Sequence, residues 1–214
     1  MEIGTFWDIV GSARSDAARS GQPFDEILTG TLAACPRPDI FGFYQRFDEL
    51  KGALYRWDVW AAAYLIGGGC SDDSFIDFRA GLIAQGRDWY EQAAASPDSL
   101  AGHPAVAGDT GDILFYEAVN YAAPRAYERI AGSYEGFYAE LGRHRGPDQR
   151  PPRDDDANMG EDFDFDDPRE MRRRLPRLSA IFLPDDAQLP DDAQLPDDAQ
   201  LPDEAQPPRR LPAP

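Results

Sequence analysis

The feature that most constrains the fold of this chain is an apolar run from Trp57 to Ile66, with the sequence WDVWAAAYLI. Nearly every position in it is apolar, and a helix that is apolar on all sides is a buried one. Three glycines follow directly, and Gly67 is suited to end a helix in the left-handed conformation. The sequence therefore predicts a buried central helix at about residues 54–66.

Further helices are predicted where apolar side chains recur every three or four residues. These segments are 5–19, about 23–35, 39–66, about 72–95 as one helix or a broken pair, and about 112–143 with a kink at Pro124. Turn-forming residues predict a loop over 96–112. No segment alternates with period two, and the hairpin dipeptides Asn-Gly and Asp-Gly are absent. We therefore expect an all-α fold, a single compact domain of about five or six helices around the central helix.

The charge distribution divides the chain into a domain and a tail. Residues 1–150 carry 13 basic and 22 acidic side chains, and residues 151–214 carry 8 and 17, so both parts have a net charge of −9. The second part is less than half as long and has three aromatic residues, too few to offset the entropy of ordering. We expect a helical domain at 1–145 and a disordered, acidic, proline-rich tail at 146–214.

Four copies of a six-residue repeat, LPDDAQ with one LPDEAQ, fill residues 183–206. A proline in every copy forbids a continuous helix, and one leucine beside two acids builds no core. The repeat is either an acidic arm for a partner or a divalent cation, or an expansion tolerated in a solvated tail. Composition favours the second interpretation.

Nucleic acid is not an expected partner of the domain, because an acidic chain repels phosphates. One basic cluster, MRRRLPRL, contains Arg172, Arg173, Arg174 and Arg177. It is either a short docking or nucleic-acid-contacting segment or a charge balance for the acidic EDFDFDD before it. Alternating blocks of opposite charge favour charge balance.

The sequence predicts a cytoplasmic protein with no membrane partner. Its N-terminal residues have neither a basic nor an apolar leader region, so we expect no signal peptide. No apolar run reaches the length of about 18 residues that spans a membrane. The two cysteines, Cys35 and Cys70, form no metal or redox motif and are expected to be reduced thiols.

Acidic residues cluster where the run after the glycines, CSDDSFIDF, begins the next helix. Asp72, Asp73 and Asp77 are candidate oxygen ligands for Mg²⁺ or Ca²⁺, although their spacing does not fit an EF-hand loop. The alternative is that Ser71 or Asp72 caps the helix and that acids in its first turn interact favourably with the helix dipole. The second interpretation is favoured, because acids gather at helix starts for that reason alone.

Two charged residues lie in apolar surroundings, Asp58 inside the central run and Arg79 on a face with Ile76 and Ile83. Because an isolated buried charge is very costly, we expect Arg79 to pair with Asp58 or with Asp72. Such a pair either fixes how two helices dock or forms the floor of a polar groove. The candidate groove residues are Asp58, Ser71, Asp72, Asp73, Arg79 and Glu117.

The stretch LYRWDVWAAAYLIGGGCSDDSFIDFRAGLIAQGRDWYEQAAASPDSL, together with Phe6 and Trp7, resembles the DUF4240 family, a bacterial domain of unknown function. The resemblance covers about residues 1–135 and leaves the tail outside. Gly81 departs from it, since an aromatic residue is expected there. The resemblance implies no activity; some relatives occur beside WGR-type domains, which points only weakly to a regulatory or nucleic-acid context.

These observations favour one functional hypothesis over two others. The first is a non-enzymatic interaction module whose polar groove at the junction of residues 67–79 receives a protein or small ligand. The second is a metal-dependent enzyme that uses Asp72, Asp73 and Glu117. The third and weakest is a regulatory protein associated with nucleic acid through the arginine cluster. No cofactor is predicted, and an enzyme is the less favoured class.

Overall fold

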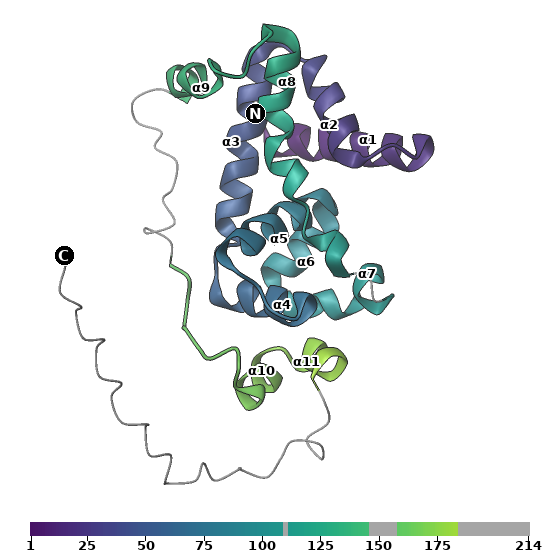
Figure 1. Cartoon of the computed structure of the whole chain (residues 1–214), viewed down its shortest axis with the longest axis vertical. Helices are drawn as coiled ribbons and strands as arrows, with labels where there is room; N and C mark the ends of the chain where they lie inside the picture. The colour runs from purple at the N-terminus through teal and green to yellow at the C-terminus, as the bar shows by residue number, and fades with distance from the viewer. Residues whose placement is uncertain (109–110, 146–157, 184–214) are drawn as a thin grey trace, which may run out of the picture. The chain divides into compact units, whose positions relative to one another are not determined.

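The computed structural model describes residues 1–108, 111–145 and 158–183, and within these ranges every regular element is a helix (Figure 1). The all-α prediction is confirmed. The α-helices are α1 (Ile3–Ser20), α2 (Phe24–Ala33), α3 (Arg37–Ala53), α4 (Trp57–Gly67), α5 (Asp72–Ala84), α6 (Arg87–Ala95), α7 (Pro104–Ala107), α8 (Ala122–Ala131), α9 (Phe137–Arg145), α10 (Pro168–Arg174) and α11 (Pro176–Phe182). Three 3-10 helices join them, η1 (Pro97–Gly102), η2 (Gly111–Leu114) and η3 (Glu117–Tyr121).

One apolar core joins these helices. α2 packs against α1 and α8, while α5 packs against α3, α6 and η3. The largest fully buried side chains are aromatic and aliphatic, and they include Phe6, Phe43, Phe75, Phe78 and Phe137. No helix among the described residues is long and apolar enough to cross a membrane.

The predicted central helix is α4, which begins at Trp57 rather than at about residue 54. The backbone leaves the helical conformation at Arg56 (φ −143°, ψ 148°), so the expected long helix over 39–66 is two helices, α3 and α4. α4 buries Val59, Ala61, Ala62, Ala63, Leu65 and Ile66. Trp57, Trp60 and Tyr64 are only partly buried. These three lie on another face of α4. The run therefore has large apolar side chains on a face that is only partly buried, as well as on its buried face.

The three glycines have roles that differ from the expected one. Gly68 (φ 63°), not Gly67, is the left-handed residue that ends α4, and Gly69 also has a positive φ of 128°. Gly67 remains helical and lies under the Phe115 ring, where a Cβ atom would be 2.9 Å from the Cζ atom. A close approach to the Phe115 side chain, and not backbone conformation, therefore favours glycine at 67.

The prediction of a helix or a broken pair after the glycines is confirmed. Ser71 is the N-cap of α5, and its side-chain oxygen accepts a hydrogen bond from the backbone N–H of Ser74 at 3.3 Å. Gly86, with φ 93°, separates α5 from α6. The apolar pattern on both sides of Gly86 is continuous, so only the glycine marks the break.

The prediction of one continuous helix over 112–143 is wrong. The chain there forms η2, η3, α8 and α9. Pro124 is the third residue of α8, in the first turn, where a missing N–H breaks no helical hydrogen bond, so it does not kink the helix. The predicted loop over 96–112 contains η1 and α7, with Asp98 and His103 buried.

The folded part of the chain does not end near residue 145. Residues 158–183 belong to the same compact unit as the first helices, and α10 and α11 bury Met171, Leu175 and Leu178. The composition of residues 151–214 as a whole is polar and acidic, so it does not reveal this short apolar group. Residues 146–157 and the repeats from Pro184 onward lie outside the described residues, so the expectation of disorder for them is not addressed.

Candidate functional site

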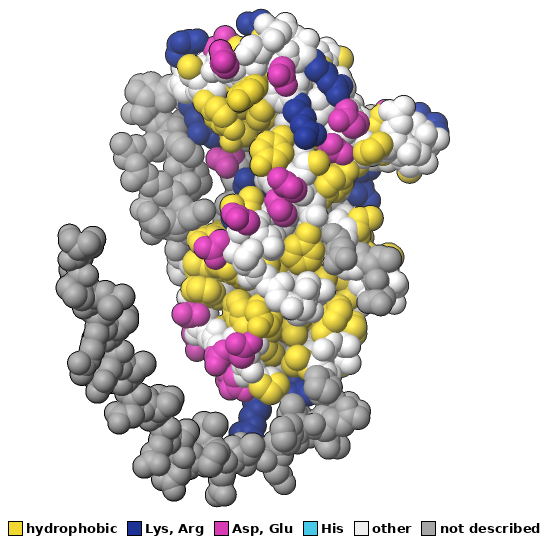
Figure 2. Space-filling view, in the orientation of Figure 1, with side chains coloured by type: hydrophobic (Ala, Val, Ile, Leu, Met, Phe, Trp, Pro, Cys, Tyr) yellow, Lys and Arg dark blue, Asp and Glu magenta, His cyan; other side chains and the backbone are white. Residues whose placement is uncertain are grey.

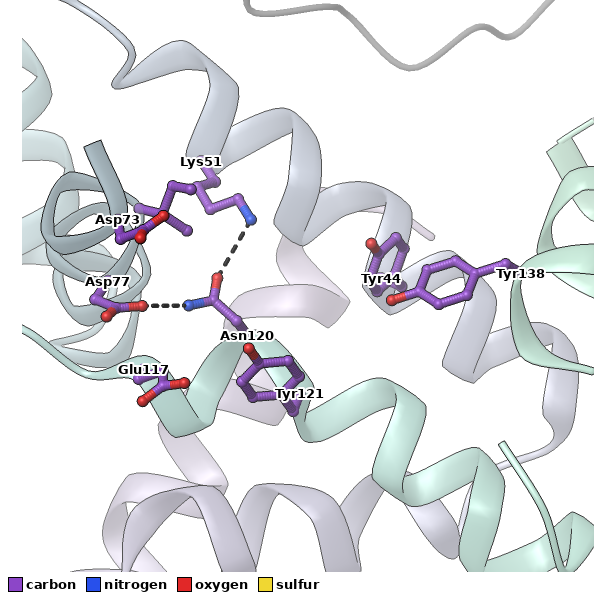
Figure 3. Close-up of a pocket in the computed structure, with 9 residues that line it drawn as sticks. Tyr44, Lys51, Asp73, Asp77, Glu117, Asn120, Tyr121 and Tyr138 are labelled. Atoms are coloured by element: carbon purple, nitrogen blue, oxygen red, sulfur yellow. Dashed lines mark hydrogen bonds between the residues drawn. The ribbon is translucent and has the colours of Figure 1, made fainter. Parts of the chain in front are cut away.

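A pocket of about 570 Å³ lies between helices that are far apart in the sequence (Figure 3). α3 contributes Tyr44 and Lys51, α5 contributes Asp73, Ile76 and Asp77, η3 contributes Glu117, Asn120 and Tyr121, and α9 contributes Tyr138. Seen from outside, acidic side chains gather beside hydrophobic ones along the face of the molecule drawn in Figure 2. The volume is in the range of small-molecule sites.

A chain of hydrogen bonds joins three of the elements that surround the pocket. The Lys51 ammonium donates to the Asn120 side-chain oxygen at 3.2 Å, and the Asn120 amide nitrogen donates to the Asp77 carboxylate at 3.1 Å (Figure 3). The backbone carbonyl of Asp77 also accepts from the N–H of Tyr116, which precedes η3. Asn120 is therefore held in one orientation between a cation and an anion.

The pocket carries more negative than positive charge. Asp73, Asp77 and Glu117 contribute three carboxylates against the single ammonium of Lys51. Burial, followed by the neighbouring Glu117 and Asp73, raises the pKa of Asp77, while Lys51 opposes this rise. The neighbouring carboxylates of Glu117 and Asp73 thus add to the effect of burial on Asp77.

Three tyrosines form the other part of the wall. The rings of Tyr44 and Tyr138 meet edge to face with centroids 6.3 Å apart, and Tyr121 and Tyr138 are exposed (Figure 3). Burial and the neighbouring Tyr138 and Asp48 raise the pKa of Tyr44, so its hydroxyl remains protonated. The pocket thus offers aromatic faces beside carboxylates.

The structure brings together only some of the predicted site residues. Asp73 and Glu117 line the pocket, as does Asp77 from the predicted metal set. Ser71 caps α5, and Asp72 is an exposed residue of its first turn that is not part of the pocket lining. Among the described residues, no group of three or more His, Cys, Asp or Glu side chains is arranged to hold a metal ion.

Asp58 pairs with Arg56 and not, as predicted, with Arg79, and Asp72, the other predicted partner of Arg79, is an exposed residue of the first turn of α5. Arg56 donates to both Asp58 carboxylate oxygens, at 2.9 and 2.6 Å, because it immediately precedes α4 and its side chain reaches forward to the first turn. Arg79 is buried, donates to the carbonyl oxygens of Lys51 and Phe75 at 3.2 and 3.4 Å, and lies over the Tyr55 and Phe75 rings. Its contacts to Lys51 and Phe75 place it at the junction of α3 and α5.

Cys70 lies between α4 and α5, but its thiol is not activated as a nucleophile. Burial raises the pKa of its thiol to about 11, Asp72 and Asp77 add to the rise, and a hydrogen bond with Trp60 opposes it. Cys70 and Cys35 are both free thiols. A nucleophilic role would require the opposite shift.

Several pocket residues could not have been selected from the sequence pattern. Tyr44, Asn120, Tyr121 and Tyr138 occur in ordinary helical surroundings, and only the folded chain brings them together. Lys51 did carry a signal, because it is the only lysine in the sequence, where 20 of the 21 basic residues are arginine. A lone lysine is a candidate for a position at which a compact ammonium serves better than a planar guanidinium.

The fold and the pocket define the class of protein, an all-α domain with an acidic, tyrosine-lined pocket. The sequence model described as "Protein of unknown function (DUF4240)" matches residues 1–129, and the chain belongs to this family. No curated protein and no solved structure is similar enough to match the chain. The matched range contains every pocket residue except Tyr138.

Proposed function

We propose that the chain is a cytosolic, non-enzymatic interaction module that binds a cationic group in the pocket between α3, α5, η3 and α9. The ligand is a small amine or the basic side chain of a protein partner. The observation that carries the proposal is the lining of one pocket by three carboxylates and three tyrosines against a single lysine.

The chemistry of the lining supports a cationic ligand in two ways. The three carboxylates, with the pKa of Asp77 raised, are stabilised by an added positive charge. The exposed rings of Tyr121 and Tyr138 can receive a cation over their faces, an interaction that strengthens as the site excludes water. The guanidinium of Arg125 already lies 5.9 Å from the centroid of the Tyr121 ring.

The test is isothermal titration calorimetry of the full chain with agmatine, spermidine and a lysine-rich peptide. We expect binding to at least one of them, weakened about tenfold or more in the Asp73→Asn, Asp77→Asn double variant and by raised salt. Asp72→Asn removes one nearby carboxylate outside the pocket and is the matched control. Absence of binding by all three cations, or equal binding by the double variant, contradicts the proposal.

The same variants test the metal-dependent alternative, in which Asp73, Asp77 and Glu117, which line one pocket but are not arranged as a metal site, would have to converge on an added ion. A bound metal stabilises the folded state by mass action. Thermal melts with Mg²⁺, Mn²⁺ and Ca²⁺ measure this directly. If one of these ions raises the melting temperature of the parent chain but not that of the double variant, the pocket is a metal site and not an amine site.

A further inference from the structure

The partly buried face of α4 is covered by the chain's own C-terminal residues. Residues 158–164 have no regular secondary structure and residues 165–166 form a turn, and the backbone N–H of Trp57 donates to the carbonyl of Met159 at 3.0 Å. The Phe165 ring centroid is 6.1 Å from that of Trp57 and 5.5 Å from that of Tyr64. The Tyr64 hydroxyl donates to the Asp166 carboxylate at 2.5 Å. One aromatic side chain, Phe165, and one acidic side chain, Asp166, therefore contact this face.

A second set of contacts holds α11, the second of the two short helices that follow. α11 packs against α4 and η1, with Leu178 and Leu175 buried. The Asp98 carboxylate of η1 accepts hydrogen bonds from the backbone N–H groups of Arg177 at 3.0 Å and of Leu178 at 2.9 Å. The first turn of α11 is thus capped by a residue about 80 positions earlier in the chain, where a helix usually supplies its own cap.

Much of the remaining order of this segment is internal to it. Arg174 forms ion pairs with Glu161 and Glu170, each at 3.0 Å, and its guanidinium carbon lies 4.2 Å from the centroid of the Phe163 ring. The arginine cluster therefore has acidic and aromatic partners within the segment. A segment that carries these contacts with it can bind as a unit.

The docked state of this segment also contains a cost. Ser99 on η1 and Ser179 on α11 have buried hydroxyl oxygens without a hydrogen-bond partner in the described structure. A buried hydroxyl that lacks a partner loses the hydrogen bonds that water would give it. Since Ser179 lies on α11, which packs on η1 and α4, release of α11 would return its hydroxyl to water and favours a reversible contact.

We propose that the face formed by α4 and η1 is a docking surface for a protein segment with two aromatic residues in an acidic run without regular secondary structure, followed by short helices. Residues 158–183 occupy this surface as an intramolecular ligand, and a segment of the same chemistry from a partner protein displaces them. The contact residues Trp57, Tyr64 and Asp98 lie inside the range matched by the family, and the occupant lies outside it. The surface thus belongs to the family domain, and this chain supplies its own occupant.

The test uses the full chain with a specific protease site inserted between residues 146 and 157. After cleavage we expect the C-terminal fragment to co-elute with the domain in gel filtration. It then exchanges with an excess of a fluorescent peptide of residues 158–183, followed by anisotropy. The peptide binds the uncleaved chain at least tenfold more weakly, because the tethered segment competes at a high effective concentration.

Matched variants separate specific docking from unspecific adhesion. Phe165→Ala in the peptide and Asp98→Asn in the chain each weaken binding about tenfold or more, while Ile181→Ala in the peptide, at an exposed position, does not. Circular dichroism confirms that the Asp98→Asn chain is folded. A fragment that dissociates on cleavage, or one that never exchanges with the peptide, overturns the proposal. Exchange that occurs only through dimers of the chain also overturns it.

Discussion

A Cβ atom on Gly81 would lie 1.9 Å from the carbonyl oxygen of Leu114, because the chain between η2 and η3 crosses directly over α5. The obstacle is backbone, so it cannot rotate away as a side chain would. The aromatic residue that the family resemblance predicts at this position does not fit here. We expect Gly81→Ala to lower the free energy of unfolding by about 3 kcal/mol or more, at or above the upper end for overpacked sites.

Urea unfolding followed by circular dichroism measures this effect. Gly11→Ala is the matched control, since Gly11 lies in α1 and a Cβ atom there meets nothing within 4 Å. Alanine at that position should raise stability by about 0.5–1 kcal/mol through its helix propensity. Equal effects of the two substitutions would show that the crossing over Gly81 is not held in this geometry.

The buried carboxylate of Asp25 connects the start of α2 to the segment that forms the pocket. It accepts from the Tyr116 hydroxyl at 2.8 Å and from Arg125 at 3.2 Å. We expect Asp25→Ala to cost about 1–3 kcal/mol, because it leaves the Tyr116 hydroxyl without its acceptor. Glu26→Ala, which removes an exposed ion pair with Arg129 in the same helical turn, should cost less than about 1 kcal/mol.

A double-mutant cycle with Tyr116→Phe isolates the contribution of the hydrogen bond. We expect a coupling energy of at least about 0.5 kcal/mol between Asp25 and Tyr116. Chemical denaturation of the four proteins measures it. Strict additivity would mean that the two groups contribute to stability through other contacts.

The ionisation of Asp77 should make stability depend on pH in a known direction. Its pKa in the folded state is raised above the ordinary 3.8, so the folded chain binds this proton more tightly than the unfolded chain. The free energy of unfolding contributed by this group therefore falls as pH rises from the ordinary pKa through the raised one. Asp77→Asn mimics the protonated form and should remove this decline.

Thermal melts between pH 3 and pH 7 test the sign. The Asp77→Asn chain should gain melting temperature relative to the parent as the pH rises, and the gain should level off near neutrality. The Asp72→Asn chain controls for the loss of one charge at the same helix start. If the melting temperature of the parent chain instead rose relative to that of Asp77→Asn with increasing pH, the pKa of Asp77 would be lowered in the folded state and not raised.

Cys70 should react slowly in the folded protein. With its pKa raised to about 11 from 9.0, the thiolate fraction at pH 8 falls about a hundredfold, and the higher nucleophilicity of a more basic thiolate offsets part of this. In a Cys35→Ser chain, alkylation by iodoacetamide should be between about tenfold and a hundredfold slower than in urea. Mass spectrometry at timed intervals gives both rates, and equal rates would contradict the shift.

The sequence predicted the fold class and the helices around the glycines because those features depend on local chemistry. Ser71 caps α5 by an interaction with its own neighbours, and the apolar run at α4 marks a core helix wherever it occurs. The breaks were harder to predict. The backbone turn at Arg56 and the break before α8 arise from tertiary packing that no local pattern records.

The candidate site was predicted only in part, and the reason is geometric. Asp73 and Glu117 could be selected as acids in suitable segments, yet their pocket also needs Tyr138 from α9 and Lys51 from α3. Asp58 was assigned to the wrong partner because charge and burial predict that a pair exists, whereas side-chain reach decides which one. Arg56, two residues away, has the shorter path.

The cap that Asp98 provides for α11 also determines when that helix can exist. An isolated helix needs about 12–15 residues to be even marginally stable in water, and α11 has seven. The helix can therefore form only after η1 has placed Asp98, which makes it one of the last elements to order during folding. The Leu178 amide is in consequence protected from hydrogen exchange only while η1 is native and α11 is docked on it.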